Sequence, residues 1–323
     1  MLGLKRVVSV SLGSSTRNKS SKFNFLGEEF LLERIGTDGD MNAFTKMFND
    51  LDGKVDAMGI GGADLYLVAG TKKYTFKDIA KCISGVKKTP VVDGSGLKHT
   101  LERNTIEYLQ GEGIIDFTQE KVLLVGAVDR YGMAQALDKV CPDVIYGDFY
   151  FGLGLPIPIR SYKRVEQLAK ILLPIITRLP LKWFYPTGKQ QEERKPKFPK
   201  LWADRTLICG DSLFILRYAP DMLEGKTIIT QSMRSQNLEF LKQAGVKRII
   251  TTTPVVDGES FATNVMEAAI VAYLGKAVSE VTENDMNEVL TKIGWKPNVI
   301  ELQENSAVTE VPQNVSTGVG SHP

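Results

Sequence analysis

Residues 121–148, KVLLVGAVDRYGMAQALDKVCPDVIYGD, constrain the fold more than any other stretch of the chain. An apolar run at 122–125 predicts a buried strand, and apolar residues at helical spacing over 133–140 predict a helix. A second apolar run at 144–146 leads to Asp148. Two strands joined through a helix form a βαβ unit, in which the strands run parallel. The stretch therefore predicts an α/β fold with a parallel sheet.

The turn of this unit has residue types that favour nucleotide binding. Gly126 permits a tight turn, and Gly132 is expected to let the helix pack closely on the strand. Backbone N–H groups at the start of the helix would attract a pyrophosphate, and Asp148 would accept hydrogen bonds from a ribose hydroxyl. Asp129 departs from the pattern because a glycine usually lets the backbone approach the phosphate there. The alternative is an ordinary βαβ crossover whose glycines serve packing only.

Further apolar runs at 206–209, 227–230 and 248–252 continue the alternation of strands and helices. Ligands of open parallel sheets bind beyond the carboxyl ends of the strands. We therefore expect a Rossmann-like doubly wound parallel sheet over residues 116–300 that binds NAD. NADP is less favoured, because Asp148 would repel a 2′-phosphate. The expected cofactor-binding residues are Gly126, Asp129, Arg130, Tyr131, Gly132, Asp148, Thr230 and Thr252.

Residues 1–115 also alternate strand-like and helix-like segments, which predicts a separate N-terminal α/β substrate domain. The apolar run at 7–12 leads into a loop with Ser14, Ser15 and Arg17, which suits a ligand that carries carboxylate or hydroxyl groups. A glycine-rich strand end, GIGG, leads to Asp64. Ser14, Ser15 and Asp64 are the expected substrate-binding residues. A solvated turn and a sharp bend are the alternatives.

The segment TPVVDGSGLKH brings charged groups to the start of another helix. Lys98 in the first turn opposes the helix dipole, which favours a functional reason for its position. It would hold a substrate hydroxyl and stabilise an oxyanion, or relay a proton if burial lowers its pKa. Lys98 and Asp93 are the expected catalytic residues, with His99 as another acid–base candidate. A solvated lysine is the alternative.

Composition narrows the class of protein. The chain has 43% hydrophobic and 24% charged residues, as ordinary soluble domains do, and its net charge of +2 gives no general attraction for nucleic acid or anionic membrane. Cys82, Cys141 and Cys209 are scattered, which predicts buried thiols in a reducing compartment and no metal site. No run approaches the roughly 18 apolar residues that span a bilayer, so the expected location is cytoplasmic.

Two polar segments complete the chain. Residues 182–205 predict a solvated loop, or a mobile lid that carries Lys189 and Arg194 over the site. The tail, assigned to residues 301–323 and unpatterned from Gln303 onward, is expected to be disordered. A small-molecule substrate is the expected partner, and a homodimer stays open.

Several motifs together resemble bacterial proteins known as quinate 5-dehydrogenases, distantly akin to shikimate dehydrogenases. These motifs are GTDGDM, TPVVDGSGLKHTLER, VGAVDRYGMA, YPTGKQ, GKTIITQS and ITTTPVVDGESFATNVMEA. The resemblance covers nearly all residues before the tail, and it implies a substrate domain ahead of a Rossmann domain. By this likeness Ser9, Ser11, Ser14 and Ser15 belong to a substrate loop, and Lys98 is the catalytic lysine. The chain lacks the Asn-Thr-Asp segment of shikimate dehydrogenases, and GSGLK replaces their Asn-Val-Thr-x-Pro form.

The resulting hypothesis is an NAD(P)-dependent oxidoreductase that acts on a small hydroxylated carboxylic acid such as quinate or shikimate. The cofactor would supply the hydride chemistry, and Lys98 would stabilise the alkoxide. One alternative is a non-redox nucleotide-binding transferase or sensor on a Rossmann-like fold. Another is a scaffold protein with a vestigial site.

Overall fold

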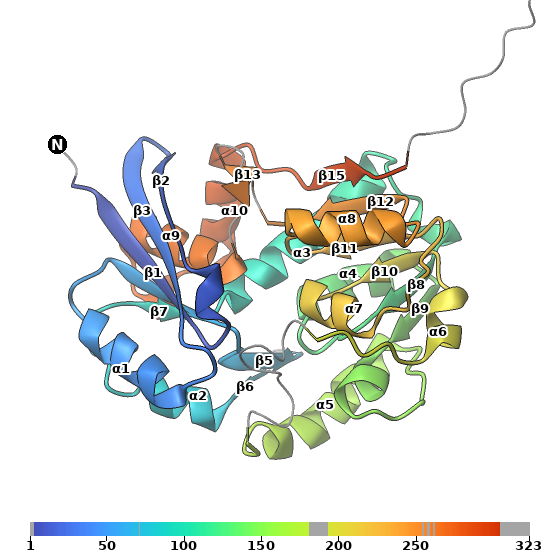
Figure 1. The fold of residues 1–323 in the computed structure, drawn as a ribbon, viewed down its shortest axis with the longest axis horizontal. Helices are drawn as coiled ribbons and strands as arrows, with labels where there is room; N and C mark the ends of the chain where they lie inside the picture. Colours follow the sequence, from blue (N-terminus) through green and yellow to red (C-terminus); the bar gives the residue numbers. More distant parts are fainter. Residues whose placement is uncertain are drawn as a thin grey trace, which may run out of the picture.

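The computed structural model describes residues 3–70, 72–180, 193–253, 255–256, 259–260 and 262–303. Two α/β halves lie side by side, each built on its own sheet (Figure 1). We call the half with the N-terminal sheet the first domain and the other half the second domain. The predicted α/β class is confirmed.

The first sheet has five strands in the order β2–β3–β1–β4–β7. These are β1 (Lys5–Ser11), β2 (Lys19–Phe25), β3 (Glu28–Gly36), β4 (Ala57–Gly61) and β7 (Val91–Val92). All neighbours pair in parallel except β2, which runs antiparallel along β3 at the edge. Because Ser11 pairs with both Gly36 and Gly61, the carboxyl ends of β1, β3 and β4 lie level.

The second sheet has six strands in the order β15–β12–β11–β10–β8–β9. These are β8 (Lys121–Leu124), β9 (Asp143–Tyr146), β10 (Leu207–Cys209), β11 (Thr227–Thr230), β12 (Arg248–Thr251) and β15 (Asn298–Glu301). All neighbours pair in parallel except β15, which runs antiparallel to β12. Leu124 pairs with Tyr146 and with Cys209, so the segments after β8, β9 and β10 emerge at one edge.

Ten α-helices surround the sheets in the described part of the chain. They are α1 (Met41–Leu51), α2 (Lys77–Ile83), α3 (Ser95–Gly111), α4 (Tyr131–Val140), α5 (Tyr162–Ile176), α6 (Pro199–Ala203), α7 (Ser212–Tyr218), α8 (Ser235–Gln243), α9 (Thr263–Leu274) and α10 (Glu283–Lys292). Short helical turns are η1 (Ser15–Arg17), η2 (Phe117–Gln119), η3 (Asp148–Gly152) and η6 (Val278–Glu280).

Both faces of the first sheet are covered, because successive strand residues point to opposite faces. Val8 and Val10 share a core with α1 and α2. Val7 and Ala57 share the other core with α9 and α10, which follow the second domain in the chain (Figure 1). The expected domain boundary therefore does not account for α9 and α10, since the predicted 116–300 domain contains these two helices, which pack on the first sheet.

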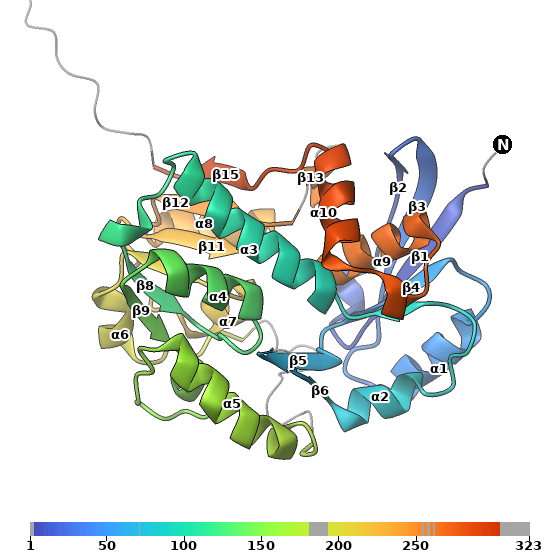
Figure 2. The same ribbon diagram turned by 180° about the vertical axis from the view of Figure 1, so that it is seen from behind.

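The second sheet is also covered on both faces. Val122 and Leu124 share a core with α4 and the start of α5, whereas Leu123 and Val125 share a core with α6, α7 and α8. The long helix α3 contacts α4 as well as α9 and α10, and so packs against both domains (Figure 2).

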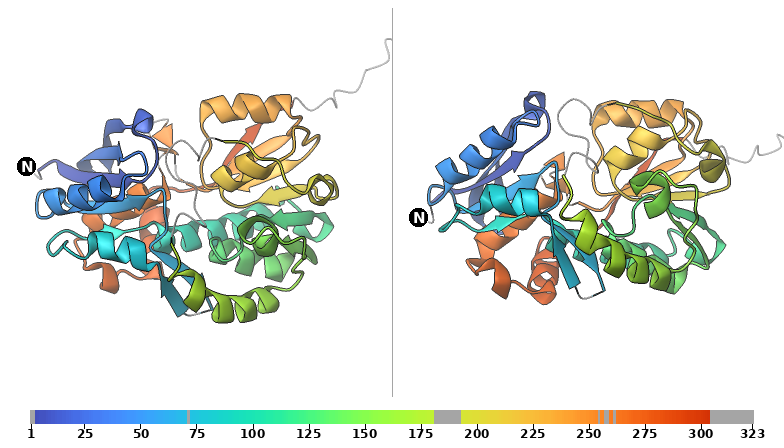
Figure 3. Two further views of the ribbon diagram at one scale, coloured as in Figure 1. Left: turned by 60° about the horizontal axis from the view of Figure 1, so that its bottom comes forward. Right: turned by 90° about the horizontal axis from the view of Figure 1, so that it is seen from below.

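A hairpin reaches from the first domain towards the second. Its strands β5 (Tyr66–Ala69) and β6 (Lys72–Thr75) pair antiparallel, and β5 contacts α5 (Figure 3). A shorter pair joins β13 (Val255–Val256) to β14 (Glu259–Ser260). Neither pair is among the strands expected from the sequence.

The apolar run at 181–185, which also predicts a strand, lies outside the described residues. Lys189 of the expected lid and the tail beyond residue 303 lie outside them too. Arg194 is described, and it forms an ion pair with Asp221. The three cysteines are buried and free, which confirms the prediction of buried thiols. Within the described residues, no helix combines the length and apolar character needed to cross a bilayer.

Candidate functional site

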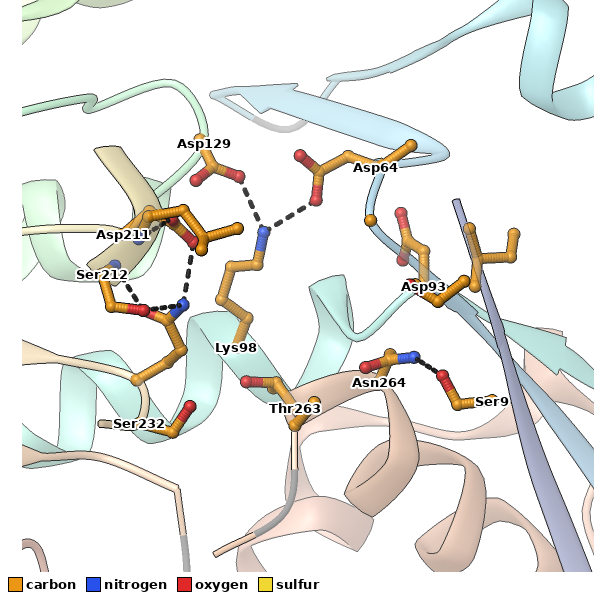
Figure 4. A pocket seen from close by; sticks show the side chains of 18 of the residues that line it. Ser9, Asp64, Asp93, Lys98, Asp129, Asp211, Ser212, Ser232, Thr263 and Asn264 are labelled. Carbon is orange, nitrogen blue, oxygen red and sulfur yellow. Dashed lines mark hydrogen bonds and ion pairs between the residues drawn. The ribbon is translucent and has the colours of Figure 1, made fainter. Parts of the chain in front are cut away.

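A polar cavity of about 260 Å³ lies where the carboxyl edges of the two sheets face each other (Figure 4). One wall comes from the ends of β1 and β4, and the other from the segments after β8, β10 and β11. In the second sheet the strand order reverses between β8 and β10. Open parallel sheets bind ligands beyond the carboxyl ends at such a switch point. We call this cavity the polar cavity.

Glycines let the strand ends of the first domain approach each other closely. A Cβ on Gly36 would lie 2.5 Å from the carbonyl oxygen of Ser14, and one on Gly61 would lie 2.9 Å from Cβ of Ser11. Real Cβ atoms do not come this close, so a larger residue at either position would push the β1 loop away. The glycine-rich strand end therefore allows β4 to lie close to β1.

The start of α9 closes the polar cavity beside the first sheet. Gly94, with φ of +88°, would bring a Cβ within 2.8 Å of the backbone nitrogen of Asn264. Asn264 donates a hydrogen bond of 2.6 Å from Nδ2 to Oγ of Ser9 (Figure 4). Thr263 and Asn264 line the cavity, although no pattern in the sequence places this helix at the first sheet.

Lys98 lies between two carboxylates at the centre of the polar cavity. Its Nζ donates to Oδ1 of Asp129 at 2.7 Å and to Oδ1 of Asp64 at 3.0 Å (Figure 4). Burial acts to lower the pKa of Lys98, but the charges of Asp129 and Asp64 outweigh burial and raise that pKa. Lys98 therefore stays protonated, so the condition for a proton relay, a pKa lowered by burial, is not met.

Arg130 extends this charge network into the second domain. Its guanidinium donates to Asp129 at 3.0 Å and to the carboxylates of Glu102 and Asp211. The side chain of Gln231 in turn donates to Asp211 at 2.8 Å. Burial acts to raise the pKa of Asp129, but Lys98 and Arg130 outweigh burial and hold that pKa well below its usual value. Burial raises the pKa of Glu102 despite the nearby Arg130.

A group of arginines from both domains lines another part of the polar cavity. Arg17 and Arg34 belong to the first domain, and Arg217 and Arg234 to the second. Arg34 donates to Oγ of Ser11 at 3.0 Å and to the carbonyl of Ser14 at 3.1 Å. The pKa of Arg34 is lowered to about 10, first by burial and then by the like charges of Arg17 and Arg234. We call Arg17, Arg34, Arg217 and Arg234 the arginine cluster.

The turn expected to hold a pyrophosphate is closed by Asp148. Its carboxylate accepts hydrogen bonds from the backbone N–H groups of Ala127, at 3.0 Å, and of Val128, at 3.0 Å. These are the donors that a phosphate at this turn would use. Asp148 is therefore an internal acceptor in this structure and does not point outward as a ribose ligand would require. Gly132 also differs from expectation: a Cβ there would lie 2.2 Å from the carbonyl of His99, so this glycine serves packing of α4 on α3.

The structure gives Asp93 a structural role, although it lines the polar cavity. Its carboxylate accepts from the backbone N–H groups of Leu65, Tyr66 and Ser95, and so fixes the start of α3 beside the segment after β4. His99 is half-buried, and burial followed by the charge of Lys98 lowers its pKa to about 3. His99 is therefore neutral, which does not suit the expected acid–base role.

Asp64, Asp93, Lys98, Asp129 and Arg130 meet at the polar cavity, as the sequence predicted for a common site. The other predicted residues lie elsewhere. The residues outside the lining of the polar cavity are Ser14, Ser15, Tyr131, Gly132, Thr230 and Thr252. Thr230 donates to its neighbour Gln231, which lines the cavity in its place.

Sequence reasoning missed most of the arginine cluster. Arg34 falls within an apolar strand, and Arg234 follows a short polar loop, so neither stands in a motif. Only their position in the sequence could have indicated a role in the site, because both residues lie near the carboxyl end of a strand. Among the described residues, no group of three or more His, Cys, Asp or Glu side chains is arranged to hold a metal ion.

Solved structures resemble this chain only weakly. An arabinose-binding protein, AraP from Geobacillus stearothermophilus, has 9% identity and a TM-score of 0.40, over 93% of this chain and 97% of its own. A glucose-galactose binding protein, GanP from the same organism, has 10% identity and a TM-score of 0.38, over 93% and 98%. A hetero-hexameric glutamate dehydrogenase from Thermus thermophilus has 10% identity and a TM-score of 0.42, over 91% and 74%. No curated protein matches the chain.

The expected resemblance to quinate and shikimate dehydrogenases is wrong. The similar solved structures are mainly substrate-binding proteins of sugar transporters, and the matching family models describe no dehydrogenase. The dehydrogenase hypothesis is wrong on the same findings, which also do not support its alternative of a nucleotide-binding transferase or sensor. The NAD cofactor, the cytoplasmic location and the homodimer stay predictions.

Two family models match the chain. One, described as a domain of unknown function (DUF8753), matches residues 6–93, which contain the five strands of the first sheet. The other matches residues 96–302, which include the whole second sheet and the helices that return to the first. Because this second match covers more than half of the chain, the protein belongs to the family described as a domain of unknown function (DUF8754).

Proposed function

We propose that the protein binds a small, negatively charged molecule with several hydroxyl groups in the polar cavity. The observation that carries the proposal is the arginine cluster, which brings like charges from both domains to one cavity. The lowered pKa of Arg34 reflects burial and then repulsion by Arg17 and Arg234. A carboxylate or phosphate among these groups would offset the repulsion and accept charge-assisted hydrogen bonds.

The carboxylates of the cavity do not oppose an anion at the arginine cluster. Asp64 and Asp129 are paired with Lys98, and Asp211 is paired with Arg130. Asp93 is held by three backbone N–H groups. Because these acids are paired, they leave the anionic group of a ligand free to bind at the arginine cluster. The hydroxyl groups of the ligand would then lie in the rest of the polar cavity.

Serine hydroxyl groups from both domains also line the polar cavity. Ser9 and Ser11 belong to the first domain, and Ser212 and Ser232 to the second (Figure 4). Each hydroxyl can donate one hydrogen bond and accept others, which suits ligand hydroxyls. This supports a polyhydroxylated anion such as a sugar acid or a sugar phosphate over a simple carboxylate.

The position of the cavity at a strand-order reversal supports a doubly wound second domain that binds its ligand at the switch point. Because the arginine cluster and the hydroxyls come from both domains, a bound ligand would bridge them. Binding would then favour a more closed arrangement, since closure brings more donors to the ligand.

The test is isothermal titration calorimetry with gluconate, glucose 6-phosphate and glucose. We expect at least one anion to bind at low salt, and glucose to bind at least tenfold more weakly. Binding of gluconate alone would identify a carboxylate site, and binding of glucose 6-phosphate alone a phosphate site. Equal affinity for glucose and for both anions, or no binding of either anion, would overturn the proposal.

Variants assign the binding to the arginine cluster. Arg34→Gln and Arg234→Gln should each weaken anion binding by tenfold or more, because each removes a cation from a partly buried site. Arg178→Gln is the matched control, because Arg178 is exposed after α5 and lies outside the cavity lining. Unchanged anion affinity in both cluster variants would locate the anion elsewhere.

A further inference from the structure

A second, apolar cavity of about 150 Å³ adjoins the polar cavity. The two cavities share Asp129, Asp211 and Phe214 in their walls, so they meet at the ends of β8 and β10. The other walls come from α5, from the hairpin region of the first domain and from the turn after β8. We call this the apolar cavity.

The lining of the apolar cavity offers hydrocarbon surface. Leu168 and Leu172 of α5 face Leu67 and Phe76, which lie at the start and just after the end of the hairpin. The acids in its wall are already engaged: Asp148 accepts from the turn amides, Asp129 pairs with Lys98, and Asp211 pairs with Arg130. Apolar lining beside a few fixed polar groups is the usual composition of a small-molecule site.

We propose that the ligand is amphipathic, with an apolar group in the apolar cavity and its anionic end in the polar cavity. This inference rests on the proposed function and adds the class of substituent that the anion carries. A cavity of about 150 Å³ lined by aliphatic and aromatic side chains holds a benzene-sized group. The substituent is therefore a phenyl group or an alkyl or isoprenyl chain of about six carbon atoms.

Gly126 offers a way to fill the apolar cavity without disturbing its walls. It lines this cavity, and a Cβ built on Gly126 meets no atom within 4 Å. Its backbone conformation is also open to other residues, because Gly126 is not among the glycines with positive φ. Gly126→Leu should therefore fold and place its side chain in the open space of the cavity.

The experiment measures the affinities of methyl, butyl, hexyl and octyl phosphate by calorimetry, with the matching alkyl carboxylates in parallel and all below their micelle-forming concentrations. Affinity should rise about fourfold for each added methylene, the factor expected for a buried methylene. The rise should stop near six carbons, because the cavity is then full. A series whose affinity does not change with chain length would overturn the inference.

The variants locate the effect. In Gly126→Leu and in Leu172→Gln the ratio of hexyl to methyl affinity should fall towards one. Ile171→Gln is the matched control on the same helix, because Ile171 is 67% exposed and lies outside the cavity lining. An unchanged ratio in both cavity variants would place the alkyl chain elsewhere and overturn the inference.

The outcomes separate this inference from the proposed function. If methyl phosphate or acetate binds through Arg34 but longer chains gain nothing, anion binding stands and the apolar site falls. If no member of either series depends on Arg34 for binding, the apolar site falls, and the titrations with gluconate and glucose 6-phosphate alone decide the proposed function.

Discussion

Lys98 and Asp129 form a partly buried ion pair, with 2.7 Å between Nζ and Oδ1, at the boundary between the two cavities. Asp64 lies on the other side of the same ammonium group at 3.0 Å. One cation thus holds together the turn after β8 and the segment after β4, which belong to different domains. The pair is positioned to set the distance between the two sheet edges.

Removal of this cation should strongly destabilise the protein. In Lys98→Met the carboxylates of Asp64 and Asp129 would remain largely buried with their shared partner gone, which typically costs about 3–5 kcal/mol. Urea unfolding followed by circular dichroism measures the loss. Lys46→Met is the control, because Lys46 and Asp50 form an exposed ion pair on α1, and its change should stay within about 0.5 kcal/mol. Similar losses of unfolding free energy in the two variants would show that the ion pairs of Lys98 stabilise the protein no more than an exposed ion pair does.

The contact between α3 and α4 should not tolerate a methyl group at Gly132. A Cβ there would lie 2.2 Å from the carbonyl oxygen of His99, a backbone atom that moves only with α3. Gly132→Ala should therefore cost about 1–3 kcal/mol of unfolding free energy. Gly111→Ala, at the end of α3, meets nothing within 4 Å and should be neutral or stabilising by up to about 1 kcal/mol. Thermal unfolding of both variants tests this contrast, and equal effects would contradict it.

Glu267 should make stability fall as pH rises. Burial, and then the charge of Asp93, raises the pKa of Glu267 to about 7, although the N–H of Leu97 donates to it at 2.8 Å. Because the folded state binds this proton more tightly than the unfolded state, the stabilisation is complete below the unfolded pKa and is lost as pH rises to about 7. The loss amounts to up to about 3 kcal/mol.

Glu267→Gln tests this dependence, because an amide oxygen can still accept from Leu97 but the side chain cannot ionise. The variant should match the parent protein at pH 5 and exceed it in unfolding free energy at pH 8. Glu107→Gln, exposed on α3, is the control and should keep the pH dependence of the parent. If the unfolding free energy of Glu267→Gln fell with pH as steeply as that of the parent, the pH dependence would come from other groups.

Asp148 should be needed for the order of the turn after β8. Asp148→Ala would leave the N–H groups of Ala127 and Val128 without their acceptor, which costs about 1–3 kcal/mol for each buried group left unsatisfied. Asp148→Asn keeps one carbonyl oxygen and should lose less. Hydrogen exchange followed by NMR should show faster exchange at these two amides in the alanine variant. Protection as strong as in the parent would mean that other groups hold the turn.

The central strands could be predicted from sequence, because each is a short apolar run bounded by polar or glycine residues. The edge strand β2, KSSKFNF, could not, since much of it is exposed and polar. Neither could the return of α9 to the first sheet. This helix is buried on nearly all sides, and helical periodicity indicates burial without saying which sheet provides it.

Individual residues of the site could be predicted from the sequence, but their arrangement could not. Lys98, Asp64 and Asp129 each stood out, but their meeting depends on the facing of two sheet edges that lie apart in the chain. The spacing to Asp148 is the same for an outward carboxylate and for one that folds back on Ala127 and Val128. Only the conformation of the turn decides between these roles.

The order in which the chain is synthesised has a consequence for the first domain. Its sheet is made from the first 92 residues, yet one face of that sheet is covered by α9 and α10, residues 263–292. A growing chain therefore carries Val7, Phe30 and Ala57 without their final cover until most of the second domain has left the ribosome. The second domain is able to bury both faces of its sheet earlier, apart from β15. The first sheet is thus covered only after most of the second sheet has been made, and during that interval it needs protection from aggregation.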